Sequence, residues 1–411
     1  MNNKPIAIVL GGTVPHIALI KNLQQRGYHT ILIDYFKNPP AKEAADEHMQ
    51  ETTLDLEKVL DIARKRKVNL VISTCLDQAN VTACYVSEKL DLPAPYSYET
   101  ALNVTNKVLM KRKMIDNNIP TSKYCHVHNV RDFDKYQLKF PVVVKPADSN
   151  GSKGVRRANN YGELHKFLEI ALTLSRCDEA VIEEYKEGLE IGIDCFVKNN
   201  EATILMTKER RKIFTSPDPI QQIYGCVWPA NITKKIHHDI KCVADAIAQA
   251  FNLENTPLMM QAIVNNDEIN VLEFAARFGG GESYKIIKLS TTFDIIDAAV
   301  DSFLGIQVSL DYKLPESYYA DNFIYARPGL FGEIAGYEEP LKNGLIEYLN
   351  YYKTKGMEIG ADMSGTNRVG VFAVKSDSRG NLFEKINATL EKIEVYDIYG
   401  KPIMRKDIYC S

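Results

Sequence analysis

A lysine at the end of an apolar strand, followed directly by a glycine-containing loop, stands out in the segment FPVVVKPADSNGSKGV, residues 140–155. The apolar residues before it are typical of a short buried strand, so Lys145 is expected at a strand end. Hydroxyl and backbone N–H groups, one more cation and two glycines follow, and glycine lets a backbone approach an anion closely. The segment predicts a phosphate-binding site, with an ordinary turn as the alternative; its loop residues are Gly151, Ser152, Lys153 and Gly154.

A second polar feature lies downstream, in VIEEYKEGLEIGIDCFV, residues 181–197. Here a strand ends in two carboxylates and a turn leads into the next strand. Such a corner can present backbone groups to the edge of an adenine ring and a carboxylate to ribose hydroxyls, although an acidic surface corner is the alternative. The residues concerned are Glu183, Glu184, Tyr185, Lys186 and Glu190.

A third feature is a predicted hairpin around Asn265-Asn266-Asp267 that carries Gln261 on one strand and Glu273 on the other. Side chains on paired strands can meet across the ladder, and two oxygens there suit Mg²⁺, which takes few protein ligands and completes its shell with water and phosphates. Arg277 and three glycines, including Gly280, follow at once. They offer a fixed cation and a backbone that can crowd an oxyanion.

Composition places these features in an ordinary globular protein. Hydrophobic residues make up 45% of the 411 residues and charged residues 25%, and the formal net charge of −3 gives no reason to expect nucleic acid or an anionic membrane as a partner. No window has the apolar length that crosses a membrane. The eight cysteines lack a CxxC pair, so we expect free thiols and a cytoplasmic location.

Strand and helix patterns alternate over the first part of the chain, which favours a parallel, doubly wound sheet of the α/β class. Gly11 and Gly12 precede Asp34 by about twenty residues, but GGTVPH lacks the third glycine of a dinucleotide-binding loop. We therefore expect a Rossmann-like domain whose first loop faces a substrate cleft. From residue 123 the pattern changes to strands with turns and a few long helices, an α+β block.

One basic run, KERRK at residues 208–212, leaves two interpretations open. It could meet a phosphate or a substrate carboxylate, or it could be the solvated end of a hairpin. The sequence alone does not separate them.

The order of these elements closely resembles the ATP-grasp superfamily. The shared features are the Asn106-Lys107 helix start, the VVVKP strand with its GSKG loop, the IEEYKEGLE corner and the LEFAARFGGG hairpin, over roughly residues 1 to 310. The region with PGLFGEIAGYEE and SGTNRVGVF is similar to the C-terminal domain of L-amino-acid ligases, and the central part also resembles the synthetase domains of carbamoyl-phosphate synthase.

The resemblance implies an ATP-grasp fold in three parts. These are an N-terminal Rossmann-like domain at 1–105, an ATP-grasp domain at 106–318 with a lid subdomain at about 120–187, and a mostly β C-terminal domain at 319–411. It also implies ATP and Mg²⁺, or Mn²⁺, as cofactors, small-molecule carboxylate and amine substrates, and a homodimer as one arrangement.

The resemblance also implies roles for individual residues. Lys107 and Lys145 would bind phosphate under the lid at 151–154, residues 183–186 would line the adenine, and Glu190 would bind the ribose. Gln261 and Glu273 would hold Mg²⁺, with Arg277 and Gly280 as the catalytic pair beside an acyl phosphate.

One position departs from the family pattern, which commonly reads Glu-x-Asn-x-Arg, because Ala275 stands where the asparagine belongs. A metal ligand is missing there. The activity that the resemblance implies is ADP-forming ligation of a carboxylate to an amine through an acyl phosphate, as in joining amino acids. The alternatives are a bicarbonate-dependent carboxylase or carbamoyl-phosphate-synthase-like enzyme, and a nucleotide-binding protein without turnover.

Overall fold

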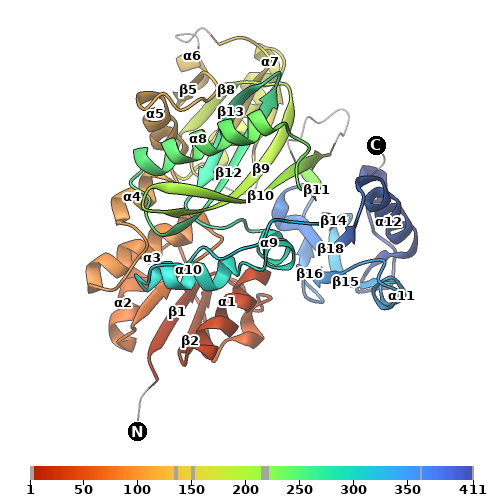
Figure 1. The fold of residues 1–411 in the computed structure, drawn as a ribbon, viewed down its shortest axis with the longest axis horizontal. Coiled ribbons are helices and arrows are strands. Elements are labelled where there is room, and N and C mark those ends of the chain that lie inside the picture. Colours follow the sequence, from red (N-terminus) through yellow and green to blue (C-terminus); the bar gives the residue numbers. More distant parts are fainter. Residues whose placement is uncertain (1–3, 134–137, 150–152, 214–221, 362, 410–411) are drawn as a thin grey trace.

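The computed structural model describes residues 4–133, 138–149, 153–213, 222–361 and 363–409. Its N-terminal part is a parallel sheet with helices packed around it (Figure 1). The strands, in their order across the sheet, are β3 (Glu47–Gln50), β2 (His29–Asp34), β1 (Ile6–Leu10) and β4 (Leu70–Ile72). The accompanying helices are α1 (Val14–Gln25), α2 (Leu56–Arg66), α3 (Asp77–Leu90) and α4 (Tyr98–Asn103).

The loop that follows β1 is held by a hydrogen bond within the N-terminal part. Gly11 has a φ of +104°, which glycine adopts without strain. The backbone N–H of Gly12 donates to the carboxylate of Asp34 at 2.7 Å. The carboxylate of Asp34 is therefore hydrogen-bonded to the loop itself.

An antiparallel sheet of eight strands dominates the rest of the molecule. Its strands run in the order β13 (Glu268–Ala275), β12 (Thr256–Asn265), β9 (Leu189–Lys198), β10 (Glu201–Lys212), β11 (Ile223–Trp228), β14 (Tyr318–Tyr325), β18 (Arg368–Ser376) and β16 (Tyr348–Tyr351). Residues from 318 onward thus continue the sheet that carries Glu190, Gln261 and Glu273. The three-part division at 105 and 318 stays a prediction.

Two smaller sheets complete the described strands. One forms the upper lobe in Figure 1, with β5 (Tyr124–Val127), β8 (Ala180–Glu184), β6 (Val142–Pro146) and β7 (Arg156–Ala158). The other lies near the C-terminus, with β17 (Glu358–Ile359), β15 (Gly329–Ala335) and β19 (Glu394–Asp397).

The remaining helices alternate with these strands along the chain. They are α5 (Lys107–Asp116), α6 (Val130–Phe133), α7 (Tyr161–Leu174), α8 (Lys234–Ala250), α9 (Ser283–Thr291), α10 (Ile295–Phe303), α11 (Glu338–Lys342) and α12 (Arg379–Lys392). None of the described helices is long and apolar enough to span a membrane.

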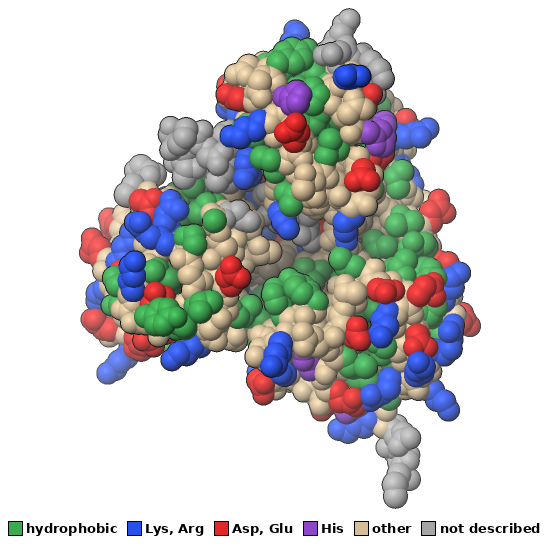
Figure 2. Space-filling model, turned by 180° about the vertical axis from the view of Figure 1, so that it is seen from behind, with side chains coloured by type: hydrophobic (Ala, Val, Ile, Leu, Met, Phe, Trp, Pro, Cys, Tyr) green, Lys and Arg blue, Asp and Glu red, His purple; other side chains and the backbone are tan. Residues whose placement is uncertain are grey.

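The N-terminal sheet and the large sheet share one hydrophobic core. This core joins residues of β1 and β4 to residues of α9, α10 and β14. Arg26, the C-cap residue of α1, reinforces the contact, because its guanidinium lies 2.5 Å from Asp297 and 2.6 Å from Asp301 of α10. Seen from behind, the surface is hollowed near its centre, between the lobes (Figure 2).

Candidate active site

Helix α5 places the first predicted phosphate ligand. Asn106 caps the helix, since its side chain accepts the backbone N–H groups of Val108 and Leu109. Lys107 is therefore held at the first helical position. Its Nζ donates to the carbonyl oxygen of Ser149 at 2.6 Å and lies 3.8 Å from Oε2 of Glu273.

Strand β6 places the second predicted phosphate ligand, Lys145. Lys145 is the fourth of its five residues, and its Nζ lies 3.0 Å from Oε1 of Glu183 on the paired strand β8. Burial by itself would lower the pKa of Lys145, but the carboxylates of Glu183 and Glu273 outweigh it, so the pKa is raised. Lys145 is therefore a charged ammonium at neutral pH.

Glu183 is shared with a lysine that the sequence analysis did not anticipate. Its Oε2 lies 3.3 Å from Nζ of Lys111, and both side chains are only 2% exposed. Burial would raise the pKa of Glu183, but the two lysines outweigh burial and lower it. The Glu183 carboxylate is thus held between two cations rather than free to meet a ligand. The spacing of four residues between Lys107 and Lys111 on one helix was the only signal in the sequence.

The hairpin brings Gln261 and Glu273 directly opposite each other, as predicted. Met259 is opposite Ala275, so no oxygen donor stands at the departure from the family pattern. Within the described residues no group of three or more His, Cys, Asp or Glu side chains could hold a metal ion. Two side-chain oxygens still fit Mg²⁺, because this ion is usually bound by one or two protein groups together with substrate phosphates.

Glu190 of β9, opposite Ile263 of β12, also lines the pocket and is also paired. Its carboxylate accepts from Nε of Arg210 at 2.6 Å and lies 2.8 Å from Nζ of Lys212. Burial would raise the pKa of Glu190, but these two cations lower it. The basic run at 208–212 is therefore part of β10 and not a solvated hairpin end. Its alternate residues share one strand face, a period-two pattern visible in the sequence.

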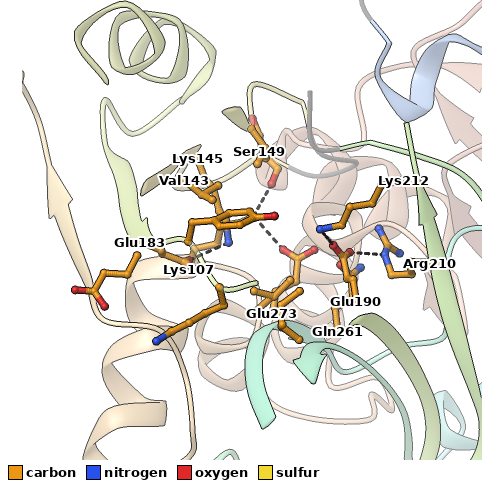
Figure 3. Close-up of a pocket in the computed structure, with 16 residues that line it drawn as sticks. Lys107, Val143, Lys145, Ser149, Glu183, Glu190, Arg210, Lys212, Gln261 and Glu273 are labelled. Carbon is orange, nitrogen blue, oxygen red and sulfur yellow. Dashed lines mark hydrogen bonds and ion pairs between the residues drawn. The ribbon is translucent and has the colours of Figure 1, made fainter. Parts of the chain in front are cut away.

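These side chains gather around one pocket (Figure 3). Lys107, Lys145, Gln261 and Glu273 share this pocket, which the sequence-based hypothesis required. The predicted adenine corner lines it too, with Glu183, Glu184, Tyr185, Lys186 and Glu190. The lining is completed by two residues of the basic run at 208–212 and by five others: Arg210 and Lys212, and Val143, Ser149, Val155, Ile263 and Leu272.

The two predicted catalytic residues, Arg277 and Gly280, lie outside this pocket. The guanidinium of Arg277 makes a two-pronged ion pair with Asp77 at the start of α3, with N–O distances of 2.6 and 2.8 Å. A β-carbon added to Gly280 would lie 3.3 Å from the carbonyl oxygen of Cys75. Neither residue is among those that line the pocket.

The predicted lid is described only in part. Lys153 is exposed, and Gly154 has a φ of +77°, a conformation that favours glycine. Neither lines the pocket. Gly151 and Ser152 lie outside the described residues. The ligand roles assigned to all these positions stay predictions.

Comparison with known proteins finds a domain match and several similar ligases. Residues 138–285 match the family model described as ATP-grasp domain. A phosphoribosylamine--glycine ligase of Caldanaerobacter subterraneus is 27% identical over 337 residues, covering 76% of this chain and 77% of that protein. The multifunctional protein ura1 of Schizosaccharomyces pombe is 22% identical over 311 residues, and this match spans 74% of the chain but only 14% of ura1.

Solved structures share the whole architecture. An L-amino acid ligase from Bacillus licheniformis has a TM-score of 0.80 at 18% identity, covering 97% of this chain and 99% of that one. A biotin carboxylase from Campylobacter jejuni has a TM-score of 0.75 at 14% identity, covering 99% and 94%.

The predicted ATP-grasp fold, of mixed α/β and α+β character, is confirmed. By its domain match and its fold, this protein is similar to ATP-grasp enzymes. Its central part is an ATP-grasp domain.

Proposed function

We propose that this protein is an ATP-dependent, ADP-forming ligase that joins a carboxylate to an amine through an acyl phosphate, with amino acids as the substrate class. The single observation that carries the proposal is the meeting of Lys107, Lys145 and Glu273 around one pocket. Similarity to an L-amino acid ligase and to a phosphoribosylamine--glycine ligase supports the same reaction type.

The residues have complementary tasks in this proposal. A carboxylate is a poor electrophile, and transfer of the γ-phosphoryl group to it creates an acyl phosphate that an amine can attack, releasing phosphate. Lys107 and Lys145 offset the charge that spreads over the transferring oxygens, an effect that is largest where water is excluded. Gln261 and Glu273 would hold Mg²⁺, which supplies further charge neutralisation when bound.

The proposal is tested by following ADP release from Mg-ATP in the presence of a panel of amino acids. Hydroxylamine in the same reaction converts an acyl phosphate to a hydroxamate, which identifies the intermediate. Lys145→Ala should abolish both signals because it removes a pocket cation. Lys166→Ala, which removes an exposed lysine of α7, should keep both. Amide product without hydroxamate and without ADP release would contradict the proposal.

Two alternatives are separated by the same assay. ATP hydrolysis that depends on bicarbonate would favour a carboxylase. The structural similarity to a biotin carboxylase is the reason for testing this alternative. Nucleotide binding without turnover is the alternative suggested by Ala275. In that case Ala275→Asn, which restores the missing oxygen donor, should create activity that the natural chain lacks.

A further inference from the structure

Lys111 is a buried cation beside the pocket that does not line it. It lies on α5 one turn after Lys107, and its side chain is 2% exposed. Its ammonium lies 3.3 Å from Oε2 of Glu183 and donates to Oγ1 of Thr121 at 2.5 Å and to the carbonyl oxygen of Val271 at 3.4 Å. These partners face it from three other segments, so Lys111 is fixed in place and cannot itself reach a ligand.

Glu183 connects this lysine to the pocket. One of its carboxylate oxygens is paired with Lys111 and the other with Lys145, which does line the pocket. The Glu183 side chain is 2% exposed, so water does not help to neutralise its charge. If Lys111 lost its charge, Lys145 would be the one cation among the described residues still paired with this buried carboxylate, and it would be held more tightly away from a ligand.

The charge balance leads to the same conclusion. Lys107, Lys111 and Lys145 form ion pairs with two carboxylates, those of Glu183 and Glu273. Three cations and two anions leave one positive charge in a region of low dielectric, where an anion is strongly attracted. Lys111 supplies that surplus without contacting the ligand.

We propose that Lys111 is a positioning residue for phosphate binding: it neutralises Glu183 from the side away from the pocket and so leaves the ammonium of Lys145 available to a nucleotide phosphate. The inference rests on the proposed function, because it assumes that the pocket takes a nucleotide.

This arrangement makes nucleotide affinity depend on pH. Burial lowers the pKa of Lys111 to about 8, against the pull of Glu183 from β8 and Glu273 from β13, while Lys145 from β6 acts in the same direction as burial. A bound anion favours the charged form of Lys111. Affinity for ADP should therefore be full well below pH 8 and should fall as the pH rises through about 8.

The experiment measures the Kd of ADP by calorimetry between pH 6.5 and 9.5. At pH 7, Lys111→Met should weaken binding at least tenfold, whereas Arg112→Met, which removes the exposed cation next in the chain, should bind as the natural protein does. Lys111→Arg should keep the affinity at pH 7 and lose the decline near pH 8, because arginine stays charged. A lysine with a merely structural role would not give this change in pH profile.

A double variant tests whether Lys111 acts through Glu183. Adding Glu183→Gln to Lys111→Met removes the carboxylate that would otherwise bind Lys145, so ADP affinity should recover relative to Lys111→Met alone. This variant also serves if Lys111→Met does not fold, because it leaves no unpaired buried carboxylate.

Three results would overturn the inference. They are unchanged affinity in Lys111→Met, an unchanged pH decline in Lys111→Arg, and no recovery in the double variant. Absence of ADP binding by the natural protein at every pH would instead overturn the proposed function, and this inference with it.

Discussion

The ion pair between Arg277 and Asp77 makes the sharpest prediction about stability. It joins the end of β13 to the first residue of α3, two segments 200 residues apart. Both oxygens of Asp77 accept, at 2.6 and 2.8 Å, and the side chains of Arg277 and Asp77 are only 10% and 19% exposed. Asp77→Asn keeps the size of the side chain and removes its charge, so the guanidinium is left largely buried without a counter-ion.

The expected cost follows from this burial. Removing one partner of a buried ion pair destabilises a protein by about 3–5 kcal/mol, and the partial exposure of Asp77 places this case near the lower limit, about 3 kcal/mol. A matched control is Asp61→Asn on α2. Its partner Lys65 lies at 2.6 Å, but the two side chains are 48% and 72% exposed. An exposed pair of this kind contributes about 0.3–0.5 kcal/mol.

Equilibrium unfolding in urea measures both variants, with the transition followed by circular dichroism. Asp77→Asn should shift the midpoint to clearly lower urea, whereas Asp61→Asn should leave it almost unchanged. Equal midpoints for the two variants would refute the reasoning that burial, and not distance, sets the strength of the Arg277 pair.

Two further predictions concern single positions. Gly154→Ala should lower the free energy of unfolding by about 1–3 kcal/mol, because its φ is +77° and the new β-carbon would lie 2.8 Å from Leu174 and 2.9 Å from Pro146. Gly380→Ala, with open space around it in α12, should instead raise the free energy of unfolding by about 0.5–1 kcal/mol in the same melting experiment. A change of the same sign in both variants would contradict this argument. Burial raises the pKa of Asp321 to about 7, so the folded state binds a proton more tightly than the unfolded state and stability falls as the pH rises from about 4 to 7. Asp321→Asn should remove this part of the pH dependence and gain stability at pH 8 relative to pH 4, which unfolding experiments at the two values can check.

Local sequence signals sufficed for the parts of the site that depend on one or two neighbouring elements. The turn at Asn266 and Asp267, both of which have positive φ, sets the hairpin register as far as Ala262 opposite Val271, and a β-bulge between Gln261 and Ala262 then brings Gln261 opposite Glu273. The start of α5 at Lys107 follows from the cap at Asn106. In both cases the physical cause lies within a few residues of the result.

Partners from distant segments could not be predicted in this way. The pairing of Lys111 with Glu183, and of Arg277 with Asp77, depends on the packing of separate elements, and a charged side chain in the sequence does not identify its counter-ion. The run at 208–212 shows the same limit: five charged or polar residues indicate solvent, yet Lys208 is buried against Asp194 at 2.7 Å. Burial of a charge is decided by the partner, not by the residue type.

The strand order of the large sheet has a practical consequence for anyone who wishes to study the nucleotide pocket by itself. β14 pairs with β11 along four residues, from Gly225 opposite Asn322 to Trp228 opposite Tyr319. A shortened chain that stops after residue 318 would lack β14. The backbone N–H and C=O groups of β11 would then be unpaired along an apolar edge strand. Such a fragment should self-associate, so the pocket is best isolated by point substitutions in the full chain.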